Sequence, residues 1–245
     1  MALKIFIRNP QGFNPDVLKF YQDNFEIVSK EEAEVIVVND FTPLETDKTV
    51  AVNVTAPDFV KAPKIIKLES GELNDFTAVA ELALGMMIMI TRLFKKEEIK
   101  GKTLGLIGSD GRIAKHFKTM AESMGMVVVG YDKKDSNGTL KELLEKSDVV
   151  SLHITSEEKN RNWFDKAKFK RMKGGAIFLN SSRPWLVEEE GLKWALNNKL
   201  SACWFDFEMN IKAKNLVTTL HIGGSTVQSR KRSEMLIAEK INKLK

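Results

Sequence analysis

The stretch GKTLGLIGSDGRIAKHFKTMAESMGMVVVGYD, residues 101–132, decides the fold. Its first apolar run predicts a strand that ends in Gly108, and a short loop with a second glycine, Gly111, follows. A helical pattern begins at Arg112, and a second apolar run leads to Asp132. This succession of strand, glycine turn, helix, strand and acidic residue is the layout of a dinucleotide-binding unit.

Each part of this layout has a reason in the chemistry of a dinucleotide. Gly108 and Gly111 let the backbone approach a pyrophosphate, and the helix N-terminus, at Arg112 and Ile113, offers backbone N–H groups and partial positive charge. Asp132 can accept hydrogen bonds from ribose hydroxyls and would repel a 2′-phosphate. The sequence therefore predicts NAD rather than NADP as the cofactor.

The glycine spacing departs from the usual G-x-G-x-x-G. From Gly108 to Ala114 the sequence is G-x-x-G-x-x-A, with one more residue between the first two glycines. The longer loop carries Asp110, whose charge would oppose a pyrophosphate unless the side chain points away. The alternative to cofactor binding is thus a Rossmann-like fold that no longer binds the dinucleotide.

Outward from this stretch, short apolar runs alternate with helical patterns. Continuous apolar strands separated by helices predict a parallel sheet covered on both faces, so the expected fold class is α/β with a Rossmann-type, doubly wound sheet. The predicted strands are Lys4–Arg8, Ala33–Val38, Thr49–Val54, Ile65–Ile66, Leu104–Ile107, Val127–Val129, Val149–Leu152, Ala176–Leu179, Ala202–Phe205 and Leu216–Leu220. The predicted helices are Asp16–Asp23, Phe76–Phe94, Arg112–Ser123, Thr139–Leu144, Lys166–Met172, Glu188–Asn198 and Gln228–Leu244.

Chain length and one charged segment predict two domains. At 245 residues the chain is longer than one ordinary domain, and residues 95–102 are charged, end in Gly-Lys and are typical of a hinge. We expect a substrate domain over residues 1–96, rejoined by a last helix over residues 225–245. The NAD-binding Rossmann domain is expected over residues 97–224.

Composition narrows the function classes. Apolar residues make up 43% of the chain and charged residues 29%, which is typical of a soluble globular protein. The net charge of +5 is scattered rather than gathered into a basic arm, so nucleic acid is not expected as a partner. The longest apolar stretch, Leu82–Ile90, is about half of what a membrane span needs, so no membrane insertion is expected.

Cysteine and histidine usage bear on compartment and metal binding. Cys203 is the only cysteine, which excludes an internal disulfide and a cysteine-rich zinc site and fits a reduced, cytoplasmic setting. The histidines lie too far apart for a local metal signature, so no metal is expected. They are His116, His153 and His221.

Further motifs lie in the second half of the chain. They are Ser147–His153 (SDVVSLH), Gly174–Glu190 (GGAIFLNSSRPWLVEEE), Asp206–Glu208 (DFE) and Leu220–Thr226 (LHIGGST). Together with residues 101–132, they resemble the D-isomer-specific 2-hydroxyacid dehydrogenases, the group that contains phosphoglycerate and glycerate dehydrogenases. The resemblance runs from residue 76 to the end of the sequence, whereas residues 1–75 are similar only loosely and are shortened.

The resemblance implies an activity, a cofactor and an assembly. A shortened member of this family would be an oxidoreductase that transfers a hydride between NAD(H) and C2 of a small 2-hydroxy or 2-keto acid. The first domain would be a smaller, flavodoxin-like α/β substrate domain, and the substrate would bind between the two domains. The resemblance also implies a homodimer through the cofactor domains.

Two residues match the positions that carry the family's chemistry. Arg183 follows Asn180-Ser181-Ser182, where the family's arginine binds the substrate carboxylate and carbonyl oxygen, and a guanidinium fork suits a planar carboxylate. His221 begins the H-x-G-G motif of the family's acid–base group, and an imidazole can give and take a proton near neutral pH. A surface arginine and a structural histidine are the alternatives.

The third catalytic residue departs from the family pattern. Members carry a glutamate five residues after the aspartate that ends the preceding strand; Asp206 matches that aspartate, but residue 211 is isoleucine. Glu208 is the only acidic residue between Asp206 and His221. If it turns toward His221, it would raise the pKa of the imidazole and fix its tautomer, and otherwise it is a solvated loop residue.

The resemblance also assigns cofactor and substrate contacts. Val54 and Thr55 lie where the family's loop holds the substrate carboxylate, but the family's glycine is absent and an ordinary turn is the alternative. Asp206 is expected near the nicotinamide carboxamide. The predicted cofactor-binding residues are Gly108, Gly111, Arg112, Ile113, Asp132, His153, Ser181, Asp206, Gly223 and Gly224.

Two rival functions stay open. The altered glycine loop, the missing glutamate and the shortened first domain favour a catalytically degenerate relative that acts as a NAD-sensing or protein-interaction module. A nucleic-acid binder rests on the net charge alone. The sequence does not identify the acid or the physiological direction of the reaction.

Overall fold

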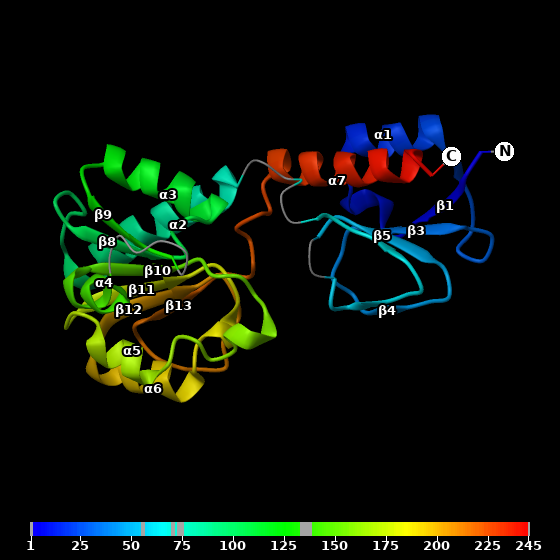
Figure 1. Cartoon of the computed structure of the whole chain (residues 1–245). Coiled ribbons are helices and arrows are strands. Elements are labelled where there is room, and N and C mark those ends of the chain that lie inside the picture. The colour runs from blue at the N-terminus through cyan, green and yellow to red at the C-terminus, as the bar shows by residue number, and fades with distance from the viewer. Residues whose placement is uncertain (1, 55–56, 70–71, 73–75, 133–138, 245) are drawn as a thin grey trace. The chain divides into compact units, whose positions relative to one another are not determined.

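The computed structural model describes residues 2–54, 57–69, 72, 76–132 and 139–244. The chain forms two compact units (Figure 1). Unit 1 consists of Met1–Asp75 and Ser225–Lys245, and unit 2 of Phe76–Gly224. Each unit is built on its own parallel sheet, so the chain as a whole is of the α/β class.

Unit 2 is built on a six-stranded parallel sheet in the order β13-β12-β11-β10-β8-β9. β10 and β11 are buried along their whole length, as continuous apolar runs predict for strands covered on both faces. The chain passes from β8 to β9 on one side and then to β10 on the other, so the strand order reverses beside β8. The strands are β8 (Thr103–Ile107), β9 (Val127–Tyr131), β10 (Val149–Leu152), β11 (Ala176–Asn180), β12 (Leu200–Phe205) and β13 (Leu216–Thr218).

Helices cover both faces of this sheet (Figure 1). The helices are α2 (Thr77–Ile90), α3 (Arg112–Ser123), α4 (Leu140–Lys146), α5 (Lys166–Arg171) and α6 (Glu189–Asn198). α2 and α3 pack on one face, where Met87 and Phe117 join Trp204 in one core. α4, α5 and α6 pack on the other, where Phe169 joins Phe178. This doubly wound arrangement confirms the predicted Rossmann-type domain.

Helix α2 is apolar on nearly every side. It continues as a π-helical turn (Thr91–Lys95), and the run Thr77–Lys95 is long and apolar enough to cross a membrane by length and composition alone, with a mean hydropathy of 1.6. Ala83 and Met87 on its inner side are fully buried in the core of unit 2. We therefore interpret α2 as a core helix whose outer side is apolar and exposed.

Unit 1 is built on a five-stranded parallel sheet in the order β2-β1-β3-β5-β7, with β4 and β6 paired separately. The strands are β1 (Lys4–Ile7), β2 (Glu26–Ile27), β3 (Val35–Val38), β4 (Leu44–Glu45), β5 (Thr49–Val52), β6 (Val60–Lys61) and β7 (Ile65–Ile66). The helices are α1 (Pro15–Asn24) and α7 (Val227–Asn242). The order within the main sheet is that of flavodoxin-like folds.

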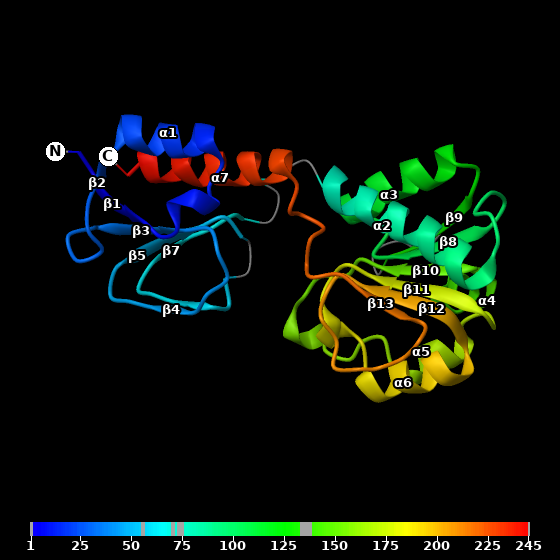
Figure 2. The same ribbon diagram turned by 180° about the vertical axis from the view of Figure 1, so that it is seen from behind.

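Helices α1 and α7 lie side by side on one face of this sheet (Figures 1 and 2). Tyr21 of α1 and Ile237 of α7 are buried there against Ile5 of β1. On the other face, Ile36 and Val50 pack against the β4–β6 pair. Unit 1 therefore draws its core from both ends of the chain.

The boundary between the units differs from the prediction. The structure divides the chain after residue 75 rather than after residue 96, because α2 packs on the sheet of unit 2. The charged segment 95–102 is not a hinge: Ile99 is buried in the core of unit 2, and the Nζ of Lys95 donates to the carbonyl oxygen of Gly175 at 2.9 Å. Charged side chains on the solvent side of an anchored segment give the same sequence pattern as a linker.

Candidate active site

The glycine loop between β8 and α3 is shaped by close packing. Gly108 has a φ of +82°, and a Cβ placed on it would lie 2.6 Å from the carbonyl oxygen of His153. The backbone N–H groups of Gly108 and Ser109 donate to the carbonyl oxygen of Tyr131 at 2.8 and 3.3 Å. The loop therefore lies against the ends of β9 and β10, and only glycine fits at position 108.

Helix α3 begins directly after this loop. Gly111 is its N-cap, and none of the described side chains forms a capping hydrogen bond to the helix. The positive end of the helix dipole is therefore directed at the loop, as in sites that bind phosphate groups. Asp110 is exposed in the same loop, so its negative charge lies at the end of the helix where an anion is favoured.

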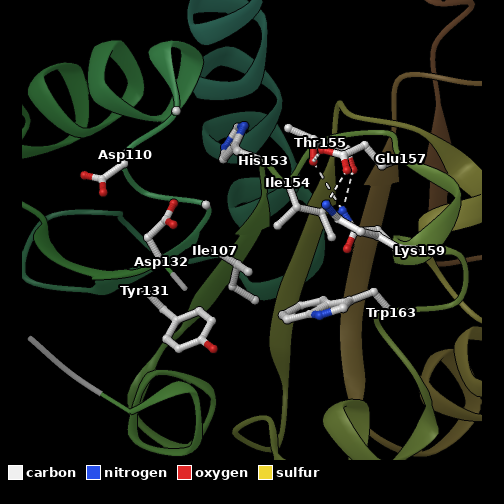
Figure 3. A pocket seen from close by; sticks show the side chains of 13 residues that line it. Ile107, Asp110, Tyr131, Asp132, His153, Ile154, Thr155, Glu157, Lys159 and Trp163 are labelled. Atoms are coloured by element: carbon white, nitrogen blue, oxygen red, sulfur yellow. Dashed lines mark hydrogen bonds and ion pairs between the residues drawn. The ribbon is translucent and has the colours of Figure 1, made fainter. Parts of the chain in front are cut away.

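A pocket of about 390 Å³ opens beside the loop. Figure 3 shows Asp110 and Asp132 on one side of it and Lys159 and Trp163 on the other. Lys159 forms an ion pair with Glu157, so its charge is largely offset. The pocket lies where the strand order reverses, and this is the position at which open α/β sheets bind ligands. Its size and its carboxylate at the end of β9 fit an adenosine ribose.

His153 lies under the glycine loop rather than in solvent. Its Nε2 lies 2.9 Å from the Oγ of Ser151, and its ring packs edge-on against Phe117. Its Nδ1 is buried and has no hydrogen-bond partner within the described part of the chain. Burial lowers the pKa of His153 to about 4, so the ring is neutral at physiological pH. This histidine supports the loop and lines the pocket, as predicted, and its protonation state suits no acid–base role near pH 7.

The turn after β11 holds Arg183. The buried Asn180 accepts from the N–H of Ser182 at 2.9 Å and donates from its Nδ2 to the carbonyl oxygen of Arg183 at 2.9 Å. The Oγ of Ser182 donates to the carbonyl oxygen of Leu152 at 3.0 Å, which ties the turn to the end of β10. Arg183 is extended, with a φ of −149°, as a residue before proline should be. Ser181 is nine-tenths buried, and its Oγ has no hydrogen-bond partner among the residues that the structure describes.

The loop that carries His221 is tied to the end of β12 by Asp206. Oδ1 of Asp206 accepts from the Oγ1 of Thr219 at 2.7 Å and from the N–H of Ile222 at 2.9 Å. Its Oδ2 accepts from the N–H of Gly223 at 2.8 Å. His221 has a φ of +54° between these anchored residues. The left-handed backbone is unfavourable for a histidine, so the anchoring holds it there.

Arg183 and His221 meet around one aromatic ring. The guanidinium of Arg183 lies 5.6 Å from the ring centre of Phe207, and the ring centres of Phe207 and His221 are 4.5 Å apart. Burial and the Arg183 charge lower the pKa of His221, and the Asp206 charge acts in the opposite direction. The structure thus brings together a guanidinium and an imidazole that share one electrostatic environment.

Three other residues predicted for the site, Glu208, Val54 and Gly223, have different surroundings. Glu208 is exposed, and its catalytic role stays a prediction. The carbonyl oxygen of Val54 accepts from the N–H of Leu68 at 3.2 Å, which extends the pairing of β5 with β7, and Thr55 lies outside the described residues. Gly223 is confined as a glycine, since a Cβ there would lie 2.9 Å from Oδ2 of Asp206. Across the described ranges, no three His, Cys, Asp or Glu side chains gather as metal ligands.

Sequence reasoning missed the residues that hold the site. Asn180, Thr219 and Phe207 position Arg183 and His221, and Trp163 forms one wall of the pocket. Asn180 directly follows the predicted strand Ala176–Leu179 and precedes Arg183 by three residues, and that placement could have indicated its role. The sequence gives no such signal for Thr219, because the positioning role of Thr219 depends on its contact with Asp206 at the edge of the sheet.

Comparison with known proteins identifies the family to which this chain is similar. Residues 85–223 match the family described as D-isomer specific 2-hydroxyacid dehydrogenase, NAD binding domain. Hydroxypyruvate reductase of Thermotoga maritima is 30% identical over 202 residues, which are 68% of this chain and 66% of that protein. D-3-phosphoglycerate dehydrogenase of Methanocaldococcus jannaschii is 30% identical over 204 residues, which are 68% of this chain and 39% of that protein. The chain thus spans between 39% and 66% of the length of these two relatives.

Solved structures share the fold. NAD⁺-bound 3-phosphoglycerate dehydrogenase of Entamoeba histolytica aligns with a TM-score of 0.79 and 22% identity over 99% of this chain and 95% of that one. A D-lactate dehydrogenase of Treponema pallidum aligns with a TM-score of 0.81 and 16% identity over 97% of this chain and 95% of that one. At these identities the likeness shows the fold alone.

Proposed function

The chain belongs to the D-isomer specific 2-hydroxyacid dehydrogenase family, and on that premise we propose that it transfers a hydride between NAD(H) and C2 of a small 2-hydroxy or 2-keto acid. One observation carries the proposal. Arg183 and His221 gather around Phe207 at the same sheet edge as the glycine loop. β8 and β12 are three strand spacings apart, about 14 Å, which suits an extended dinucleotide between the two places.

The glycine loop and its pocket would hold the cofactor. Gly108 leaves no room for a Cβ, α3 has no side-chain cap, and Asp132 follows β9 where a ribose diol would lie. These features fit the adenosine and pyrophosphate of NAD, and Asp132 disfavours a 2′-phosphate. When bound, NAD(H) supplies the hydride acceptor or donor.

Arg183 and His221 would act on the substrate. The guanidinium fork binds the planar carboxylate and, in the reducing direction, stabilises the negative charge that develops on the carbonyl oxygen. His221 donates a proton to that oxygen in reduction and accepts it in oxidation. Because the Arg183 charge lowers the pKa of His221, a carboxylate bound to Arg183 would offset that charge and favour the imidazolium needed for reduction.

The outer side of α2 supports a homodimer as part of this proposal. Met89, Leu93 and Phe94 are exposed at 41%, 54% and 37% of their surface on one helical segment of unit 2. Large apolar side chains gathered on one exposed face favour a protein partner, and the same face on a second copy is the simplest complement. The interface would lie within the cofactor-binding unit.

The first test is a fluorescence titration with NADH and NADPH. Trp163 lines the pocket, so energy transfer from tryptophan to a bound nicotinamide should give saturable NADH binding and much weaker NADPH binding. Small 2-keto acids are then screened for NADH oxidation, and light scattering of the same preparation should give the mass of two chains. NADH binding without turnover of any acid would favour the non-catalytic relative, to which the exposed Glu208 and the charged Asp110 also point.

Arg183→Ala separates the two halves of the proposal. Turnover should fall by at least about 100-fold, because the carboxylate is no longer clamped in the reactive geometry. NADH affinity should stay nearly unchanged, because Arg183 lies outside the pocket beside the glycine loop. Retained turnover would show that another group binds the carboxylate.

A further inference from the structure

Asp206 is bound on both of its oxygens to the loop that carries His221. The carboxylate is 1% exposed, and Thr219, Ile222 and Gly223 donate three hydrogen bonds to it. A second set of bonds fixes the loop from below: the Nε1 of Trp204 donates to the Oγ1 of Thr219 at 3.0 Å, and the N–H of Thr219 donates to the carbonyl oxygen of Phe205 at 3.0 Å. Residues on both sides of His221 are therefore anchored to β12.

This anchoring explains the backbone of His221. A φ of +54° is unfavourable for histidine, and the residues that precede and follow it cannot relax without breaking bonds to a buried carboxylate. Gly223 adds a steric requirement, because any Cβ there would lie 2.9 Å from Oδ2 of Asp206. The Trp204–Thr219–Asp206 chain thus sets the direction in which the imidazole leaves the loop.

The charges near His221 come from two segments of unit 2, the turn after β11 and the loop after β12. Arg183, on the turn after β11, disfavours the imidazolium, and Asp206, at the end of β12, favours it. Glu208 follows β12 but is exposed, so solvent screens its charge. Residue 211, where the family has its glutamate, is isoleucine.

We propose that Asp206 takes over the task of the missing glutamate: as a positioning residue it holds His221 in its reactive orientation through the loop backbone and favours its protonated form, with Thr219 and Trp204 as its support. The catalytic part of this inference rests on the proposed function. The effect of Asp206 on His221 itself can be measured without turnover. The cofactor is not needed for the positioning, which the chain's own residues provide.

The test follows the imidazole signal of His221 by NMR as a function of pH in the cofactor-free protein, with His221→Gln to assign the signal. Asp206→Asn should lower the pKa of His221 and reduce kcat/KM by about tenfold or more, mainly through kcat. Thr219→Val should reduce kcat with a smaller change in titration, and Thr219→Ser should restore it. Glu190→Gln on α6 removes an exposed charge elsewhere in unit 2 and is the matched control.

Three outcomes decide between the explanations. An unchanged His221 titration in Asp206→Asn overturns the proposal, and so does a lowered pKa in Glu208→Gln, which would make Glu208 the partner. If Asp206→Asn fails to fold, Thr219→Val must still reduce kcat in a folded, NADH-binding protein, or the positioning role is wrong. A shifted titration in a protein that turns over no acid would leave the positioning intact and contradict the proposed function instead.

Discussion

The glycine loop and the His221 loop lie at the same edge of one sheet but are held in opposite ways. The glycine loop is fixed by the absence of side chains: Gly108 packs on the backbone of His153, and its bonds run from backbone to backbone. The His221 loop is fixed by one buried carboxylate, Asp206, which accepts three hydrogen bonds. One loop leaves room for a ligand, and the other directs a side chain.

The two loops therefore differ in how clearly the sequence predicts them. A loop made by missing side chains shows in the sequence as glycines at fixed spacing. A loop made by a buried carboxylate shows only as an aspartate after an apolar strand, and its partners are backbone N–H groups that no sequence pattern marks. The two histidines also differ: burial keeps the His153 ring neutral, whereas His221 is exposed and lies between the charges of Arg183 and Asp206.

The largest expected effect concerns His153 and stability in acid. The unfolded histidine takes up a proton near pH 6.5 and the folded one only near pH 4, so the unfolded state binds more protons between these values. The free energy of unfolding should therefore fall by about 3 kcal/mol from pH 6.5 to pH 4 on account of this residue. Urea unfolding of the wild type and His153→Gln across this range should show a shallower slope for the variant. Parallel slopes would mean that His153 is protonated in the folded protein.

A smaller effect is expected from filling the glycine loop. Gly108→Ala places a Cβ 2.6 Å from a backbone oxygen at a φ of +82°, whereas Gly101→Ala has a similar φ of +76° and open space around it. Both variants carry the backbone cost of about 1 kcal/mol, and Gly108→Ala should lose about 2 kcal/mol more and bind NADH weakly. Thermal unfolding and NADH titration measure both quantities. Equal losses would show that the loop yields easily and is not fixed by packing.

The smallest effect should come from the charge in the glycine loop. Asp110 is exposed at the N-terminus of α3 and lines the pocket, so Asp110→Asn should tighten NADH binding by about threefold at low salt. The gain should shrink as salt is added, since screening removes the repulsion that the variant relieves. Titrations at two salt concentrations test this. Identical affinities would show that the carboxylate points away from the phosphates.

Much of unit 2 could be predicted from the sequence because its central strands, β8 and β10 to β12, are buried along most of their length. Helix α3 has the predicted bounds, Arg112–Ser123, and β10 spans the predicted Val149–Leu152. The two-residue strands β2, β4 and β6 are not among the predicted strands, because two residues carry no periodicity. The domain boundary was wrong because α2 is apolar on most sides and its packing partner cannot be identified from its own pattern.

The residues of the candidate site also differ in how far the sequence could predict them. Arg183 and His221 could be located because each follows an apolar strand in a recognisable motif, and the structure gathers them around Phe207. The role of Asp206 could not be predicted, because it depends on how residues 219–223 turn back over the end of β12. The sequence gives the residues of a loop between two strands, but it does not give the path that the loop backbone takes.

The division of unit 1 between the two ends of the chain has a consequence for synthesis. Unit 2 is one continuous segment, so every residue of its two cores is translated before α7. The core of unit 1 includes Ile237, Ala238 and Ile241, which follow all of unit 2. The strands of unit 1 that precede unit 2 in the chain therefore cannot complete their core until α7 has been translated.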